Sequence, residues 1–270
     1  MTESRAEVLA LDFDGVISDS VVESFVVAAR TLARLDPGAG AARAASGLDW
    51  SDAAALRSHS LYGDFLELMP LGNRAEDFGV AFRVLEQGRT RIDQAEFDAL
   101  REELGRDFLQ QFHSTFYEER AALRAEDSRG WLALLEPFEP FVEVLRRRAE
   151  DRILTVATAK DRVSIELLLD AYGIAELFPD ELVVDKEAGR SKRAHLELLG
   201  RRLGVAYDQI TFIDDKLTHL EDVAGLGVRC ALAGWGYNGP RERESAARRG
   251  FLVCDLASAE EDLFGVSEGT

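Results

Sequence analysis

Two aspartates near the start of the chain have the spacing of a shared acid site. Asp12 and Asp14 follow an apolar run, residues 8–11, and Gly15 comes directly after them. Residues i and i+2 of an extended chain point to the same side, so both carboxylates can face one site. When two carboxylates lie this close together, either both bind the same cation or one of them has a raised pKa. The spacing therefore predicts acid–base or metal chemistry at the end of a buried strand.

Two later apolar runs also end in polar side chains. Residues 153–157 run into Thr158, and residues 210–213 run into Asp214 and Asp215. In open α/β sheets, ligands bind beyond the carboxyl ends of the strands. We therefore expect these groups to gather with the first aspartate pair at one edge of a sheet.

The lysines of the chain lie in the part of the sequence that holds the two later strand ends. Only four of the 32 basic residues are lysines, Lys160, Lys186, Lys192 and Lys216, and all lie in the second half of the sequence. A preference for arginine explains the scarcity of lysine but not its position. Lys192 opens a predicted helix, and a helix N-terminus itself favours a bound phosphate. Lys186 and Lys160 remain alternatives for an anion-binding lysine.

The composition restricts the kinds of molecule that the protein is expected to bind and the compartment in which it is expected to occur. The net charge of −18 argues against nucleic acid and against an anionic membrane, which both require basic surfaces. No apolar run approaches 18 residues, and the N-terminus lacks a signal pattern, so we expect a cytoplasmic protein. Cys230 and Cys254 stand in apolar surroundings, which predicts buried free thiols in a reducing compartment.

The pattern of the chain changes at a proline-rich segment, residues 136–140. Before it, residues 21–136 are predicted to be helical, with helices over 22–35, 52–59, 74–86 and 93–119. After it, helices are expected over 141–148, 163–172, 192–203 and 217–224, and strands over 152–157, 182–184, 210–213, 228–232 and 251–253. This alternation predicts an α/β core from residues 1–20 and 137–270, with a doubly wound parallel sheet.

The first motif resembles that of a known family. Residues 12–16, Asp-Phe-Asp-Gly-Val, are similar to the Asp-x-Asp-Gly-(Val/Thr) signature of haloacid dehalogenase (HAD) superfamily phosphatases. The helical block of residues 21–136 also falls where that family inserts a cap. Residues 231–238 resemble the aromatic-glycine loop of its phosphoglycolate phosphatase-like branch. The resemblance covers about residues 8–20 and 137–257, and implies a Rossmann-like α/β core with an inserted α-helical cap.

The resemblance also implies roles for the residues at the strand ends. Asp12 would be the nucleophile that becomes an aspartyl phosphate, and Asp14 the general acid and base. Family members that dehalogenate lack the second acid, so its presence favours phosphate chemistry. Thr158, with Ala159 beside it, would bind the phosphoryl oxygens, and Thr155 is the weaker alternative because it lies inside the strand.

Lys192 fits the family's third motif, which holds the nucleophile and the phosphate by charge. Asp12, the backbone carbonyl of Asp14, Asp214 and Asp215 would together hold Mg²⁺, which prefers oxygen ligands.

The fourth motif departs from its commonest form, Gly-Asp-x-x-x-Asp. Asp214 stands at the glycine position, and His219 stands where the second acid usually falls. Asp214, Glu221 or Asp222 could supply the missing oxygen. His219 is a poor Mg²⁺ ligand, so it is expected to hydrogen-bond a ligand or to be a plain helix residue.

The sequence thus predicts a Mg²⁺-dependent phosphatase acting on a small phosphorylated metabolite. A phosphosugar mutase keeps the same four motifs and stays open, as does a non-catalytic phosphate-binding protein. A phosphoacceptor receiver module is rejected by chain order, because receivers place the acidic pair first. Polar residues of the insert are candidates for substrate binding: Arg57, His59, Tyr62 and Arg74. Neither the substrate nor the oligomeric state is predicted.

Overall fold

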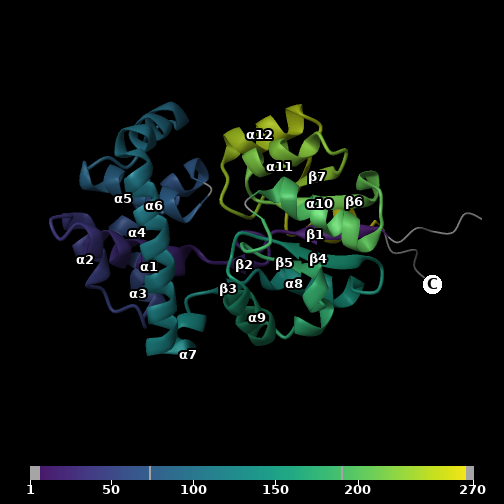
Figure 1. Ribbon diagram of the computed structural model, residues 1–270, viewed down its shortest axis with the longest axis horizontal. Coiled ribbons are helices and arrows are strands. Elements are labelled where there is room, and N and C mark those ends of the chain that lie inside the picture. Colours follow the sequence, from purple (N-terminus) through teal and green to yellow (C-terminus); the bar gives the residue numbers. More distant parts are fainter. Residues whose placement is uncertain (1–6, 73, 190, 266–270) are drawn as a thin grey trace, which may run out of the picture. The chain divides into compact units, whose positions relative to one another are not determined.

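The computed structural model describes residues 7–72, 74–189 and 191–265 (Figure 1). The chain divides into two compact units. One combines Met1–Asp19 with Pro137–Thr270, and the other is Ser20–Glu136. Within the described residues, no helix has the length and hydropathy of a membrane span.

A six-stranded parallel sheet forms the centre of the first unit. Its strand order is β5-β4-β1-β6-β7-β8. The strands are β1 (Val8–Leu11), β4 (Ile153–Ala157), β5 (Val183–Val184), β6 (Ile210–Asp214), β7 (Arg229–Ala233) and β8 (Leu252–Cys254). All four residues of β1 are fully buried, which explains why its sequence is a continuous apolar run. The chain continues to β4 on one side of β1 and later to β6 on the other, so the carboxyl end of β1 lies at a switch point of the sheet.

Helices cover both faces of this sheet. They are α8 (Glu139–Arg148), α9 (Arg162–Ala171), α10 (Lys192–Leu203), α11 (Leu217–Ala224), α12 (Pro240–Arg248) and α13 (Ala259–Phe264). Figure 1 shows α8 and α9 on one face and α10 and α11 on the other. Leu196, Leu199 and Leu220 pack with Val8 and Phe212 in one buried cluster between the sheet and its helices. The predicted doubly wound fold is confirmed.

The second unit is helical. It contains α1 (Val21–Leu35), α2 (Gly40–Ser46), α3 (Ala53–Ser58), α4 (Ser60–Leu68), α5 (Ala75–Glu86), α6 (Gln94–Glu126) and α7 (Ser128–Leu132). Helix α6 contributes aromatic side chains to the core of this unit, since Phe97, Phe112 and Phe116 are buried. At Gly105 the backbone of α6 leaves helical geometry, with φ of 75°, a conformation that favours glycine.

Two short strands stand where the chain passes between the units. These are β2 (Ser18–Asp19) and β3 (Glu136–Pro137), which form a two-stranded sheet. Just beyond β3, the Phe138 N–H donates a hydrogen bond of 2.9 Å to the carbonyl of Ile17. The α/β chain therefore resumes beside the point where it was interrupted.

Both cysteines of the chain, Cys230 and Cys254, lie in the α/β unit. They are buried free thiols, as predicted.

Candidate active site

Four of the predicted site residues meet at the carboxyl edge of the sheet. Asp12 follows β1, Thr158 follows β4, Asp214 ends β6 and Lys192 begins α10. The pairing of β1 with β6 continues one residue past the end of β1. There the Asp12 N–H donates a hydrogen bond of 2.9 Å to the Ile213 carbonyl. All four side chains belong to buried residues, with Asp214 fully inaccessible to solvent. Polar and charged groups buried to this extent require hydrogen-bond or ion-pair partners.

Lys192 joins the first and last carboxylates. Its Nζ lies 2.7 Å from Asp12 Oδ1 and 3.2 Å from Asp214 Oδ2, and donates to the Ala157 carbonyl at 2.8 Å. Burial opposes the charge on Lys192, but the two carboxylates outweigh it and raise the pKa of the ammonium. Ser191 fixes the start of the helix, since its Oγ accepts from the Ala194 N–H at 3.2 Å.

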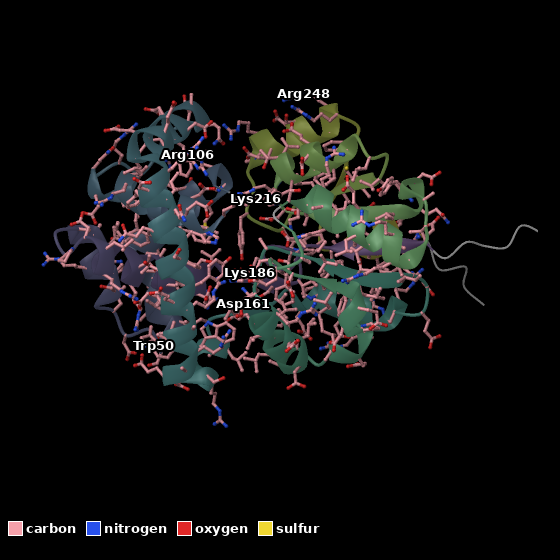
Figure 2. The ribbon with its side chains drawn as sticks, in the orientation of Figure 1. Trp50, Arg106, Asp161, Lys186, Lys216 and Arg248 are labelled. Atoms are coloured by element: carbon pink, nitrogen blue, oxygen red, sulfur yellow. The ribbon has the colours of Figure 1, made fainter. Side chains whose placement is uncertain are left out.

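The other two lysines of this region have different neighbours. The ammonium of Lys186 lies 3.7 Å from Glu187, and that of Lys216 donates to the Tyr237 carbonyl at 3.2 Å (both lysines are labelled in Figure 2). Of the three candidate lysines, Lys192, Lys186 and Lys160, Lys192 is the one placed against Asp12.

Burial and charge affect the two aspartates differently. Burial raises the pKa of Asp12 to about 6, although Lys192 opposes the rise. Burial also acts on Asp214, but His219 and Lys192 outweigh it and hold the pKa of Asp214 well below its usual range. Asp12 Oδ1 accepts hydrogen bonds from Lys192 and from the Phe13 N–H, the latter at 2.7 Å. Among the described residues none donates to Oδ2, so that oxygen is available to a cation or a substrate.

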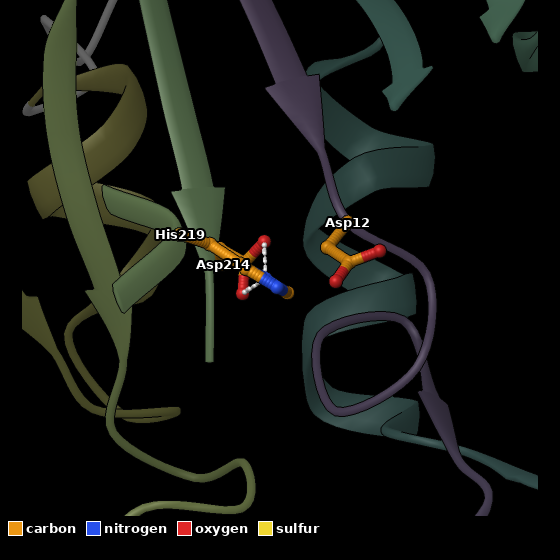
Figure 3. Close-up of side chains that lie close together, drawn as sticks. All are labelled: Asp12, Asp214 and His219. Atoms are coloured by element: carbon orange, nitrogen blue, oxygen red, sulfur yellow. Dashed lines mark hydrogen bonds and ion pairs between the residues drawn. The ribbon is translucent and has the colours of Figure 1, made fainter. Parts of the chain in front are cut away.

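A candidate metal site lies beside this pair. Asp12, Asp214 and His219 each offer a ligand atom within 4.8 Å of the others (Figure 3). His219 Nδ1 lies 3.1 and 3.0 Å from the two Asp214 oxygens. Neighbouring ligands of a six-coordinate ion, each about 2.1 Å from it, also lie roughly 3 Å apart. The donors fit a divalent cation, and the imidazole nitrogen makes the set less purely oxygen than expected.

Asp215, which was also predicted to bind the metal, is buried near this group and packs against a loop. One carboxylate oxygen accepts from the Tyr237 N–H at 2.9 Å, and burial raises the pKa of Asp215 to about 7. A Cβ on Gly15 would lie 2.5 Å from its carboxyl carbon, and one on Gly236 would lie 2.3 Å from its Cβ. Both loops therefore require glycine in order to pack against Asp215.

Asp14 has a partner that the sequence interpretation did not assign to it. Its Oδ1 lies 2.8 Å from the ammonium of Lys160. The Lys160 side chain is 0% exposed and that of Asp14 is 33% exposed. The Lys160 N–H also donates to Thr158 Oγ1 at 3.2 Å. The available signal was the position of Lys160, two residues beyond Thr158 and three beyond the end of β4, a strand adjacent to β1.

The remaining predicted residues are placed as follows. Ala159 lies between Thr158 and Lys160. The alternative, Thr155, is fully buried inside β4, and its hydroxyl has no hydrogen-bond partner among the described residues. Arg57 lies in α3 of the helical unit, where it pairs with Glu136 at 3.2 Å.

Comparisons with solved structures show the same fold. A predicted phosphoglycolate phosphatase from Haemophilus somnus matches with a TM-score of 0.58 and 17% identity, covering 94% of this chain and 96% of the other. A presumed phosphoglycolate phosphatase from Lactobacillus delbrueckii matches with a TM-score of 0.65 and 13% identity, covering 97% and 99%. A HAD family hydrolase from Deinococcus radiodurans with bound phosphate and sodium matches with a TM-score of 0.54 and 17% identity, covering 97% and 96%.

Sequence comparison gives the family. No curated protein matches the chain. Residues 6–221, however, match the haloacid dehalogenase-like hydrolases as a family. This match spans the first motif, the helical insert and the acidic pair that ends β6. The chain therefore belongs to the haloacid dehalogenase-like hydrolase family.

Proposed function

We propose that the protein is a metal-dependent phosphatase that hydrolyses a small phosphomonoester through a phosphorylated Asp12. The observation that carries this proposal is the setting of Asp12. The carboxylate follows the central strand, Lys192 holds its Oδ1, and no described residue occupies its Oδ2. A nucleophilic carboxylate needs one fixed oxygen and one that can reach the substrate.

The reaction then proceeds in two steps on residues of this chain. In the first, Asp12 attacks phosphorus, the bond to the leaving oxygen breaks, and Asp14 gives that oxygen a proton. In the second, water attacks the phosphoryl group on Asp12 while Asp14 takes a proton from it. The products are an alcohol and inorganic phosphate, and both aspartates return to their starting state. Lys192 balances negative charge throughout, and the hydroxyl of Thr158 is assigned to the phosphoryl oxygens.

A divalent cation, which we take to be Mg²⁺, would be held by Asp12 and Asp214, with His219 as a third donor and the backbone carbonyl of Asp14 as a further one. When bound, it shields the incoming phosphate from the carboxylates. Asp215 is proposed as a further carboxylate ligand, since besides burial the charges of Asp214 and Asp12 act on it and raise its pKa.

The related structures support the choice of substrate class. Two are described as predicted or presumed phosphoglycolate phosphatases, and a third contains bound phosphate. We extend this to the present chain as a small phosphorylated metabolite. The insert supplies none of the groups assigned above, so we assign to it the choice of leaving group, with Arg57 as its first candidate.

The decisive experiment is a panel of phosphorylated metabolites, assayed with Mg²⁺, with Mn²⁺ and with a chelator. We expect release of inorganic phosphate that depends on the metal and is abolished by Asp12→Asn. An isomeric sugar phosphate instead of inorganic phosphate would identify a mutase. Full activity of Asp12→Asn, or a beryllium fluoride adduct on another residue, would refute the assignment of the nucleophile.

A further inference from the structure

We propose that Lys160 is the positioning residue for Asp14, fixing the direction in which that carboxylate exchanges protons with the leaving group and with water. The proposal rests on the proposed function and assigns a task to a buried lysine that the two reaction steps do not use.

The ion pair is asymmetric in its exposure to solvent. The ammonium of Lys160 is 2.8 Å from Asp14 Oδ1, and its side chain is 0% exposed against 33% for Asp14. A buried ammonium is costly unless it is paired. Lys160 therefore holds the carboxylate from the protein side, while the exposed part of Asp14 faces outward.

Lys160 is itself firmly placed. Its N–H donates to Thr158 Oγ1 at 3.2 Å, and its carbonyl accepts from the Lys186 N–H at 3.3 Å. Its ammonium lies 5.9 Å from the centroid of the Phe13 ring. One residue thus connects the proton-transfer group, Asp14, to the hydroxyl assigned to the phosphoryl oxygens. The link to Thr158 uses the Lys160 backbone, and the link to Asp14 uses its side chain.

The geometry favours positioning over direct contact with the phosphate. The ammonium of Lys160 is directed at Asp14 Oδ1, 2.8 Å away, whereas that of Lys192 lies against the nucleophile Asp12. Fixing Oδ1 of a carboxylate sets the direction of its second oxygen. General acid–base catalysis requires a heavy-atom distance of about 2.6–3.2 Å, and a misplacement of about 1 Å can reduce the rate about 100-fold.

The first test compares leaving groups. An alkyl phosphate needs its leaving oxygen protonated, whereas p-nitrophenol leaves with little help. We expect Lys160→Met to lower kcat about 10- to 100-fold on an alkyl phosphate. The loss on p-nitrophenyl phosphate should be much smaller, and KM should change little on either. Lys160→Arg, which keeps the charge, should recover part of the loss.

The second test is a double-mutant cycle with Asp14→Asn. If Lys160 acts through Asp14, adding Lys160→Met to Asp14→Asn should cause no further loss on the alkyl phosphate. The double variant also removes both charges of the pair, so it stays informative if Lys160→Met alone fails to fold. Unfolding transitions of all variants identify that case.

Arg162→Met is the matched control. Arg162 also lies just after β4 and pairs with an aspartate at 2.8 Å, but that aspartate is Asp185. Its removal should affect both leaving groups equally.

Two results would overturn the proposal. One is a rise in KM on both substrates with Lys160→Met, which would make Lys160 a phosphate ligand. The other is an equal loss with and without Asp14→Asn, which would make its effect independent of Asp14. By contrast, if Asp14→Asn itself shows no dependence on the leaving group, the acid role in the proposed function is wrong.

Discussion

The carboxylate of Asp12 lies 2.7 Å from the ammonium of Lys192, yet burial still raises its pKa to about 6. A cation bound at this carboxylate must therefore displace a proton at mildly acidic pH. We therefore expect Asp12 of the metal-free protein to take up a proton as the pH falls through about 6.

We accordingly expect divalent-metal affinity to rise with pH through about 6, and metal binding at or below that pH to release a proton. Calorimetric titration in buffers of different ionisation enthalpy measures this release. Asp12→Asn should abolish it. A pH-independent affinity between pH 5 and pH 8 would contradict the prediction.

The nitrogen donor of His219 should affect the choice of ion. Imidazole suits Mn²⁺ and other transition metals better than Mg²⁺, which prefers oxygen. Replacing it by a carboxylate, His219→Asp, should therefore raise the affinity for Mg²⁺ relative to Mn²⁺. Competition titrations read this ratio without measuring turnover. In wild-type protein bound to Mn²⁺, a nitrogen coupling in the electron spin echo spectrum should be present, and His219→Asp should remove it. Its absence from wild type would exclude His219 as a ligand.

His195 should make the α/β unit sensitive to acid. It is buried in α10, and burial followed by the charge of Lys192 lowers its pKa from 6.5 to about 4. The unfolded chain therefore binds more protons than the folded one between these values, so stability falls as pH falls through this range. The loss by pH 4 is about 3 kcal/mol at most. In denaturant titrations, His195→Gln should flatten this dependence, and an unchanged slope would show that another group causes it.

Gly236 should be intolerant of a side chain. A Cβ there would lie 2.3 Å from the Asp215 Cβ and 2.4 Å from the Gly15 carbonyl oxygen. Gly236→Ala should therefore displace the loop that carries Asp14 and reduce both stability and turnover. The destabilisation expected from such overpacking is about 1–3 kcal/mol. Gly63→Ala is the control, because Gly63 lies in helix α4 with nothing within 4 Å of the added atom. Equal melting temperatures for the two variants would contradict this interpretation.

Much of the site could be predicted because apolar runs mark strand ends. Asp12, Thr158 and Asp214 each follow or end such a run, and parallel strands bring those ends to one edge. Lys192 could be favoured over Lys186 because it begins a helix. The helical insert was predicted by its periodicity, although α2, α4 and α7 were missed. These helices are short, so their patterns span few turns.

The pairings themselves could not be predicted. The contact of Lys160 with Asp14 joins residues distant in sequence and depends on the register of β1 against β4. His219 meets Asp214 because of where α11 begins after β6, which two adjacent aspartates do not specify. The arrangement of Asp215 depends on a loop more than 20 residues later, around Tyr237.

The central position of β1 also has a consequence for synthesis on the ribosome. Val8 pairs with Ile153 and Ile210, so both neighbours of β1 emerge only after the whole helical insert. Chains fold from the N-terminus as they are made, at about 5–20 residues per second. The nascent β1, four apolar residues in a row, must therefore wait unpaired for several seconds while α1 to α7 appear. Folding of the insert during that interval, with its aromatic core closed, would leave β1 as the main exposed apolar segment and a natural site for a chaperone to protect.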